Sequence, residues 1–107
     1  MKPHKAIAAL EALAQESRLA VFRLLMDTGE QGLPAGKIAE ILHIPPATLS
    51  FHLAQLSKAG LVSSERNGRM VIYMPNYKRL RKLLSFLKIG LPKKAKKEAP
   101  EPASPVQ

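Results

Sequence analysis

Apolar residues recur at every third or fourth position through the first half of the chain, which is the spacing of one face of an α-helix. A first helix is predicted from His4 to Ala14. A second is predicted from about Ser17, its expected N-cap, to Asp27. Because apolar residues occupy most sides of this second segment, we expect it to lie at the centre of the fold. Turn-forming residues at positions 28–32 end it.

Two further helices are predicted on either side of a proline-containing connection. Pro34 suits the first turn of a short third helix. The connection at 43–45 interrupts the pattern, because a residue that precedes proline avoids the helical region. A fourth helix is predicted over 46–59, and Gly60 ends it as a left-handed residue. The apolar stripe of this fourth helix is expected to be buried and consists of Leu49, Leu53 and Leu56.

The pattern then changes from helical spacing to two strand-like runs, at 61–66 and 69–74. Asn-Gly between two such runs is the strongest short-range signal of a β-hairpin, so the turn is predicted at Asn67-Gly68. Asn76 can cap a fifth helix whose apolar stripe continues to about residues 89–90. The predicted order is therefore four helices, two strands and one helix.

This order predicts a mainly α fold with a two-stranded β-hairpin. Two consecutive helices joined by a short turn and followed by a hairpin are the layout of a winged helix-turn-helix. Residues 1–90 are predicted to form this domain. Residues 91–107 consist largely of Lys, Ala, Pro and Glu without an apolar period, so we expect a basic, disordered tail.

The net charge of +9 is unevenly distributed along the chain. Residues 1–77 carry eight Lys and Arg against six Asp and Glu, whereas residues 78–107 carry nine against two. A basic balance favours a polyanionic partner such as nucleic acid. For the tail, the alternative is a solubilising segment. The four lysines expected to add attraction to DNA there are Lys93, Lys94, Lys96 and Lys97.

The chain contains no cysteine, which excludes disulfides, thiolate metal sites and thiol redox sensing by its own residues. It contains no run of about 18 apolar residues, so no membrane-spanning helix is predicted. The N-terminal segment reads as an amphipathic helix and not as a signal peptide. These features fit a cytoplasmic protein.

The fourth helix carries polar side chains on the flank away from its leucine stripe, and it contains no Asp or Glu that would repel phosphates. Short hydroxyls and an amide on such a flank reach base edges or phosphate oxygens in the major groove. An ordinary solvated helix face is the alternative. The residues that we expect to face outward and contact DNA are Thr48, Ser50, Phe51, His52 and Gln55.

Arg66 and Arg69 flank the predicted hairpin turn. Arginines at such a tip lie along a DNA backbone or enter a minor groove, so we expect the hairpin to act as a DNA-binding wing. The alternative is a charged hairpin that keeps the protein soluble.

Four stretches of the chain resemble the ArsR family of bacterial repressors, and together they cover most of residues 7–77. They read LAQESRLAVFRLL, AGKIAEIL, ATLSFHLAQLSKAGLV and ERNGRMVIYMPN. The most specific part is Ser50, His52 and Leu53, followed by the pattern L-x-x-A-G-L-V. The resemblance implies a homodimer that binds a palindromic operator on double-stranded DNA and releases it when a ligand binds.

The resemblance also implies that the first and last helices form the dimer interface. Both helices carry an apolar stripe that a two-fold dimer would bury, which fits this independently of the family. The alternative is that the stripes cover the core of a monomer. The predicted interface residues are Ile7, Leu10, Leu13, Leu80, Leu83, Leu84 and Leu87.

The chain departs from the family at the positions that sense metals. Where many members have cysteines early in the third helix, this sequence has Pro34 and Gly36, and its last helix lacks Asp, Glu and His. The three histidines are far apart in sequence, so we expect neither a metal nor a cofactor. The inducer stays open between a small organic ligand, a partner protein and no ligand at all.

No nucleophile–base–acid arrangement and no glycine-rich phosphate loop is visible, so the chain is not expected to be an enzyme. The leading hypothesis is a homodimeric, DNA-binding transcriptional repressor. Because residues 1–77 are only mildly basic, the alternative is a winged-helix module that uses the same helix face on a protein partner.

Overall fold

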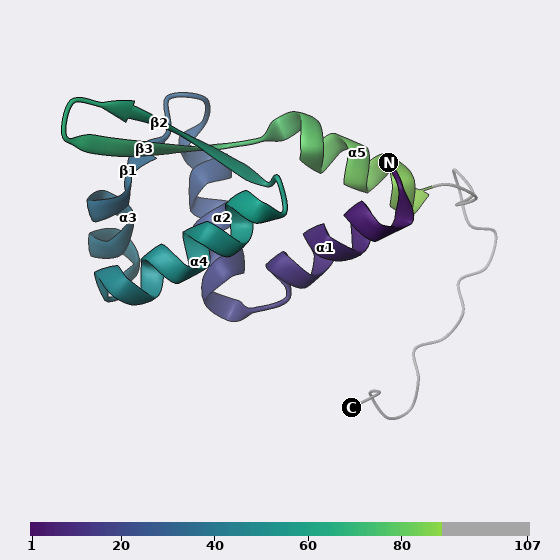
Figure 1. Cartoon of the computed structure of the whole chain (residues 1–107), viewed down its shortest axis with the longest axis horizontal. Helices are drawn as coiled ribbons and strands as arrows, with labels where there is room; N and C mark the ends of the chain where they lie inside the picture. Colours follow the sequence, from purple (N-terminus) through teal and green to yellow (C-terminus); the bar gives the residue numbers. More distant parts are fainter. Residues whose placement is uncertain (89–107) are drawn as a thin grey trace.

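The computed structural model describes residues 1–88, so the predicted tail lies outside the described residues. Figure 1 shows α1 and α5 beside each other at one end of the molecule, and α3 with the β-hairpin at the other. The helices are α1 (Pro3–Leu13), α2 (Glu16–Thr28), α3 (Ala35–Leu42), α4 (Pro46–Lys58) and α5 (Tyr77–Lys88). The strands are β1 (Leu33–Pro34), β2 (Val62–Asn67) and β3 (Met70–Pro75).

The winged helix-turn-helix prediction is confirmed, but the sheet has three strands and not two. Strand β1 pairs antiparallel with β3, with Leu33 opposite Tyr73, and the strand order is β1-β3-β2. A two-residue strand is too short to show the alternation of polar and apolar residues by which strands are recognised. Its pairing partner also lies about forty residues further along the chain.

The hairpin turn lies one residue later than predicted. Asn67 pairs with Met70, so the two-residue loop consists of Gly68 and Arg69. Gly68 has a φ of +65°, whereas neither Asn67 nor Arg69 has a positive φ. A glycine with positive φ at the first of two loop positions is the pattern of a type II′ turn. Arg69 therefore lies in the turn itself.

Helices α2 and α4 provide the centre of the core, as their apolar patterns predicted. Val21 and Leu25 on α2 are fully buried. On α4, the exposed fractions are 2% for Leu49, 1% for Leu53 and 0% for Leu56. Helix α4 is thus anchored to the core by one apolar face, and its opposite face is exposed.

Helix α1 packs against this core through alanines and not through its larger apolar residues. Ala6, Ala9 and Ala12 are buried, whereas Ile7 and Leu10 are exposed. Small side chains allow the backbone of α1 to come close to its neighbours. In α5 the buried residue is Leu83, which is 2% exposed. Its assignment to a dimer interface was therefore wrong, because it belongs to the core of its own chain.

Side-chain caps fix the ends of two helices. Gln15, and not the expected Ser17, caps α2, since its Oε1 accepts the backbone N–H of Arg18 at 2.8 Å. Asn76 caps α5 as predicted, since its Oδ1 accepts the N–H of Arg79 at 3.1 Å. The amide of Asn76 also donates to the carbonyl of Gly60 at 2.8 Å. This bond ties the start of α5 to the end of α4, where Gly60 has the predicted left-handed φ of +78°.

Among residues 1–88, no helix has the length and apolar content needed to cross a membrane.

Candidate nucleic-acid interface

The turn between α3 and α4 sets the direction of α4. His43 ends α3 in the left-handed conformation, with a φ of +55°, and its N–H donates to the carbonyl of Ala39. Pro45 then stands at the N-cap of α4 and Pro46 at its first helical position. Both prolines have their φ fixed by the ring, so the angle at which the chain enters α4 is restricted.

Helix α4 presents an outward face without any carboxylate. Phe51 lies at the centre of this face and is 58% exposed. Gln55 is half-buried and, with Ala8 and Glu11 of α1, lines a shallow hollow beside the C-terminal half of α4. The exposed side chains of this helix are Pro46, Ala47, Thr48, Ser50, Phe51, Ala54, Ser57 and Lys58. We call this set, together with Gln55, the α4 outer face.

The first turn of α4 carries no side-chain cap, because Pro45 has no polar side chain. Pro46 has no N–H, and the amides of Ala47 and Thr48 have no partner within the helix because they precede its first hydrogen bonds. These two amides lie at the positive end of the helix dipole. Such amides are suited to bind a phosphate oxygen.

His52 is not part of the α4 outer face, and its predicted outward orientation was wrong. The side chain is 7% exposed. Nδ1 of His52 lies 3.5 Å from Nη1 of Arg18. Arg18 is itself held by Nε, which donates to the carbonyl of Ala12 at 2.7 Å. A guanidinium can only donate, so Nδ1 accepts and the imidazole is neutral in this contact.

The surroundings of His52 agree with this neutral state. Burial lowers the pKa of the imidazole, and the positive charge of Arg18 lowers it further. His52 therefore links α4 to α2 and, through Arg18, to the end of α1. A contact with DNA bases would require the ring to leave this position.

The hairpin extends beyond the helices at the end of the molecule opposite α1 and α5 (Figure 1). Strand β2 is exposed from Ser63 to Asn67, and Arg66 and Arg69 are both exposed. The two arginines predicted for a wing are therefore accessible at its tip.

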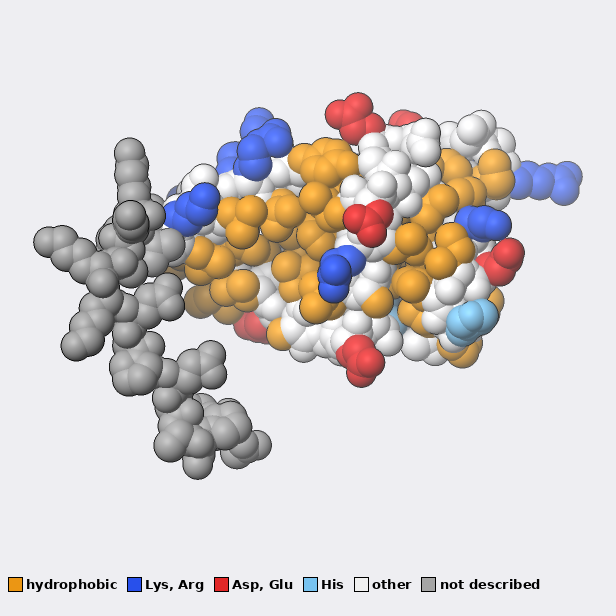
Figure 2. Space-filling view, turned by 180° about the vertical axis from the view of Figure 1, so that it is seen from behind, with side chains coloured by type: hydrophobic (Ala, Val, Ile, Leu, Met, Phe, Trp, Pro, Cys, Tyr) orange, Lys and Arg blue, Asp and Glu red, His pale blue; other side chains and the backbone are white. Residues whose placement is uncertain are grey.

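The apolar residues expected at a dimer interface divide into two groups. Leu13 and Leu80 are half-buried against the core. The exposed group has exposed fractions between 42% and 55% and consists of Ile7, Leu10, Leu84 and Leu87. We call these four residues the α1–α5 apolar face. Figure 2 shows hydrophobic side chains continuing from the α1–α5 end of the molecule across its middle.

Sequence reasoning named five residues of α4 as DNA contacts. Two further polar side chains of this helix, Ser57 and Lys58, are also exposed. The helical period contained the signal for Lys58, which lies seven residues after Phe51 and so on the same side. Among residues 1–88, no three His, Asp or Glu side chains come close enough together to hold a metal ion.

Comparisons with known proteins agree with this arrangement. A helix-turn-helix domain family matches residues 13–65. The transcriptional activator HlyU of Vibrio cholerae is 30% identical over 83 residues, which cover 78% of this chain and 74% of that protein. An ArsR-like transcriptional regulator from Rhodococcus sp. RHA1 superposes with a TM-score of 0.72 at 26% identity, covering 80% of this chain and 78% of that one. The chain belongs to the ArsR family of transcriptional regulators.

Other relatives of this ArsR-family chain are named as a repressor and as a homodimeric DNA-binding domain. The repressor SmtB of Mycobacterium tuberculosis is 36% identical over 64 residues, which cover 60% of this chain and 45% of that protein. A homodimeric winged helix-turn-helix DNA-binding domain from Mycobacterium bovis superposes with a TM-score of 0.66 at 25% identity, covering 80% of this chain and 78% of that one. The family resemblance read from the four sequence stretches is thus confirmed.

Proposed function

We propose that this ArsR-family regulator is a homodimeric repressor that reads a palindromic operator with α4 and the β2–β3 wing. The observation that carries the proposal is the α4 outer face, which is exposed, free of carboxylates and fixed from behind by three buried leucines. A helix seated in this way can enter a major groove without unfolding any of its own core contacts.

The positions on the α4 outer face suggest a division of contacts. Thr48 and Gln55 lie on one flank of the helix and Ser50 on the other, with Phe51 between them. An amide such as that of Gln55 can pair with adenine, and apolar groups such as Phe51 can contact a thymine methyl. The uncapped amides of Ala47 and Thr48 would hold a phosphate and so fix the position of the helix.

The wing would add contacts to the DNA backbone or to the adjacent minor groove. Arg66 and Arg69 are exposed at its tip. Guanidinium groups bind phosphates with two donors and are also attracted to a narrow minor groove. Their contribution depends on charge, so it weakens as salt rises.

A two-fold dimer would present two copies of α4 to two half-sites. The α1–α5 apolar face supports this. Its four large apolar side chains are 42–55% exposed, and covering them with a second copy of the chain lowers the free energy. The M. bovis relative is named as a homodimer. A dimer of this kind reads half-sites separated by about one turn of DNA.

Repression needs only the DNA-binding surface and the dimer contact. A dimer bound over a promoter blocks polymerase through DNA binding and dimerisation alone, whereas activation requires a further contact with the transcription machinery. We therefore propose repression, although the relative HlyU is named an activator. In a reporter assay with the selected operator, deleting the protein is expected to raise transcription.

The direct test selects an operator from random DNA and measures affinity by fluorescence anisotropy. The double variant Ser50→Ala with Gln55→Ala is expected to bind this operator at least about 30-fold more weakly, because two base contacts are lost and each contributes roughly 1–3 kcal/mol. A matched control replaces Ser85 and Gln31 by alanine, since both are exposed and neither lies on α4.

Three outcomes would contradict the proposal. If random DNA yields no enriched sequence, the protein does not read base sequence. If binding does not weaken as salt rises, several phosphate contacts are absent. Equal affinity of the test and control variants would exclude the α4 outer face as the reading surface. The winged-helix protein-interaction module would then be the better explanation.

A further inference from the structure

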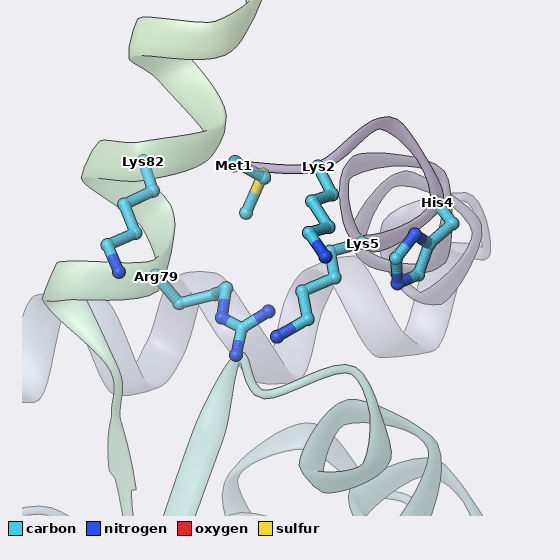
Figure 3. A pocket seen from close by; sticks show the side chains of 6 residues that line it. All are labelled: Met1, Lys2, His4, Lys5, Arg79 and Lys82. Atoms are coloured by element: carbon cyan, nitrogen blue, oxygen red, sulfur yellow. The ribbon is translucent and has the colours of Figure 1, made fainter.

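A hollow with an unusual concentration of positive charge lies where the start of α1 meets the first two turns of α5. Its volume is about 390 Å³. Its walls are formed by Met1, Lys2, His4, Lys5, Arg79 and Lys82. Four of these six side chains are lysine or arginine and none is acidic. Figure 3 shows Arg79 and Lys5 reaching toward each other across the gap, with Lys82 on the next turn of α5.

No carboxylate of the described chain neutralises this hollow. Among residues 1–88, the one ion pair joins Lys37 to Glu40 on α3, at the far end of the molecule. Like charges that converge without a counter-charge repel one another, and a bound anion relieves this repulsion. An anion with two or more charges does so most effectively, because it can contact several of the cations at once.

Arg79 is held in place before any ligand arrives. A Cβ atom at Gly60 would lie 2.9 Å from Cζ of Arg79, so the guanidinium rests directly on the Gly60 backbone. The backbone N–H of Arg79 donates to Oδ1 of the cap residue Asn76, which fixes the position of this residue on α5. A guanidinium already packed against Gly60 loses little side-chain freedom when its fork of donors binds two oxygens of one phosphate.

The hollow is separate from the three surfaces used by the proposed function, which are the α4 outer face, the wing and the α1–α5 apolar face. None of its residues belongs to the α4 outer face or to the wing. On α5, Lys82 precedes the exposed Leu84 by two residues, and on α1, Lys5 precedes the exposed Ile7 by two residues. Residues two apart on a helix point to different sides. A second copy covering the apolar face therefore leaves the charged side chains on another flank of the same helices.

A second hollow of about 480 Å³ adjoins the first and shares Met1 and Lys82 with it. The rest of its lining consists of Lys78, Arg81, Ser85 and Phe86. The apolar side chains of Met1 and Phe86 would contact the organic part of a ligand whose charged part lies beside Arg79.

From these observations we infer that the α1–α5 junction is a binding site for a small molecule that carries a phosphate or diphosphate group. The charged part contacts Lys5, Arg79 and Lys82, and the organic part extends toward Phe86. This inference goes beyond the proposed function, which uses none of these four side chains.

The test titrates the full-length free protein with inorganic pyrophosphate at low salt by isothermal titration calorimetry. The variant Lys5→Gln with Lys82→Gln is expected to bind at least about tenfold more weakly, because each charged hydrogen bond lost costs enough to change affinity by this order. The control variant Lys37→Gln with Lys88→Gln removes the same charge outside the hollow and is expected to bind like the wild type.

A second measurement separates a small-molecule site from a DNA contact. Operator affinity of both double variants is compared without pyrophosphate, and the two are expected to be equal. If the Lys5 and Lys82 variant binds the operator more weakly than the control, the hollow contacts the DNA backbone and the inference is overturned. Equal loss of pyrophosphate binding in both variants would overturn it too, since the attraction would then be a property of the whole surface.

Discussion

His52 lies between an exposed phenylalanine and a buried leucine, and its own orientation is decided by Arg18. The pattern of α4 alone placed the imidazole on the outward polar flank, which was wrong. Arg18 stands 34 residues earlier in the chain and its guanidinium takes Nδ1 as an acceptor. Leu49, Leu53 and Leu56 were predictable from spacing, whereas His52 depended on a contact between distant residues.

The neutral, buried state of His52 predicts a pH dependence of stability. Burial lowers the pKa of the folded imidazole below its usual value of about 6.5. As pH falls below that value, the unfolded chain takes up a proton that the folded chain does not yet bind. The free energy of unfolding is therefore expected to decrease from pH 7.5 to pH 5.5, and to level off only below the folded pKa.

Urea unfolding at these two pH values checks this expectation. The variant His52→Asn keeps an oxygen that can accept from Arg18 but cannot titrate, so it is expected to lose much of the pH dependence. His43→Asn is the control, because that imidazole is exposed and asparagine tolerates the left-handed backbone found there. The same pH dependence in wild type and His52→Asn would show that the neutral imidazole does not contribute.

At the scale of elements, α1 shows why an amphipathic pattern can predict a helix and yet leave its orientation open. Ile7 and Leu10 formed the obvious apolar stripe. The structure buries Ala6, Ala9 and Ala12 instead. Alanine is too small to dominate a hydrophobic pattern, but it allows close approach of helix backbones. Strand β1 escaped prediction for a related reason, since a two-residue element has almost no pattern of its own.

The close packing of α1 predicts a difference between two neighbouring alanines. Ala9 is fully buried and Ala8 is exposed. The substitution Ala9→Leu overfills the contact between α1 and the core, so it is expected to lower the free energy of unfolding by roughly 1–3 kcal/mol. Ala8→Leu makes the same chemical change on the outer side and is expected to alter stability by less than about 0.5 kcal/mol.

Chemical denaturation at one protein concentration measures both variants. The structure would be contradicted if Ala8→Leu proved the more destabilising of the two, because that result would place Ala8 on the buried side of α1.

The surfaces proposed for DNA binding and for dimerisation lie in different parts of the molecule. The wing and α3 lie at one end, the α1–α5 apolar face lies at the other, and α4 runs between them (Figure 1). The sequence predicted the elements that carry each surface, because a hairpin signal and two apolar stripes are local features. It could not predict which apolar residues remain exposed, because that depends on how α1 and α5 pack on the other helices.

The α1–α5 apolar face predicts that assembly and operator binding are lost together. Leu84 is 48% exposed, so Leu84→Glu is compatible with the folded chain. In a two-fold dimer the change places two carboxylates at an apolar contact, where each would lose water without gaining a partner. Sedimentation equilibrium is expected to show a monomer. Operator affinity is expected to fall at least about tenfold, because the half-sites are then bound independently.

Ser85→Glu is the matched control for this prediction. It adds the same carboxylate at the next position of α5, on an exposed side chain that is not part of the apolar face. This control is expected to stay dimeric and to keep most of its operator affinity, since one added charge lies away from the α4 outer face. If both variants remain dimers, the two-fold contact lies elsewhere. If Leu84→Glu becomes a monomer with unchanged operator affinity, reading of the operator does not require two linked copies of α4.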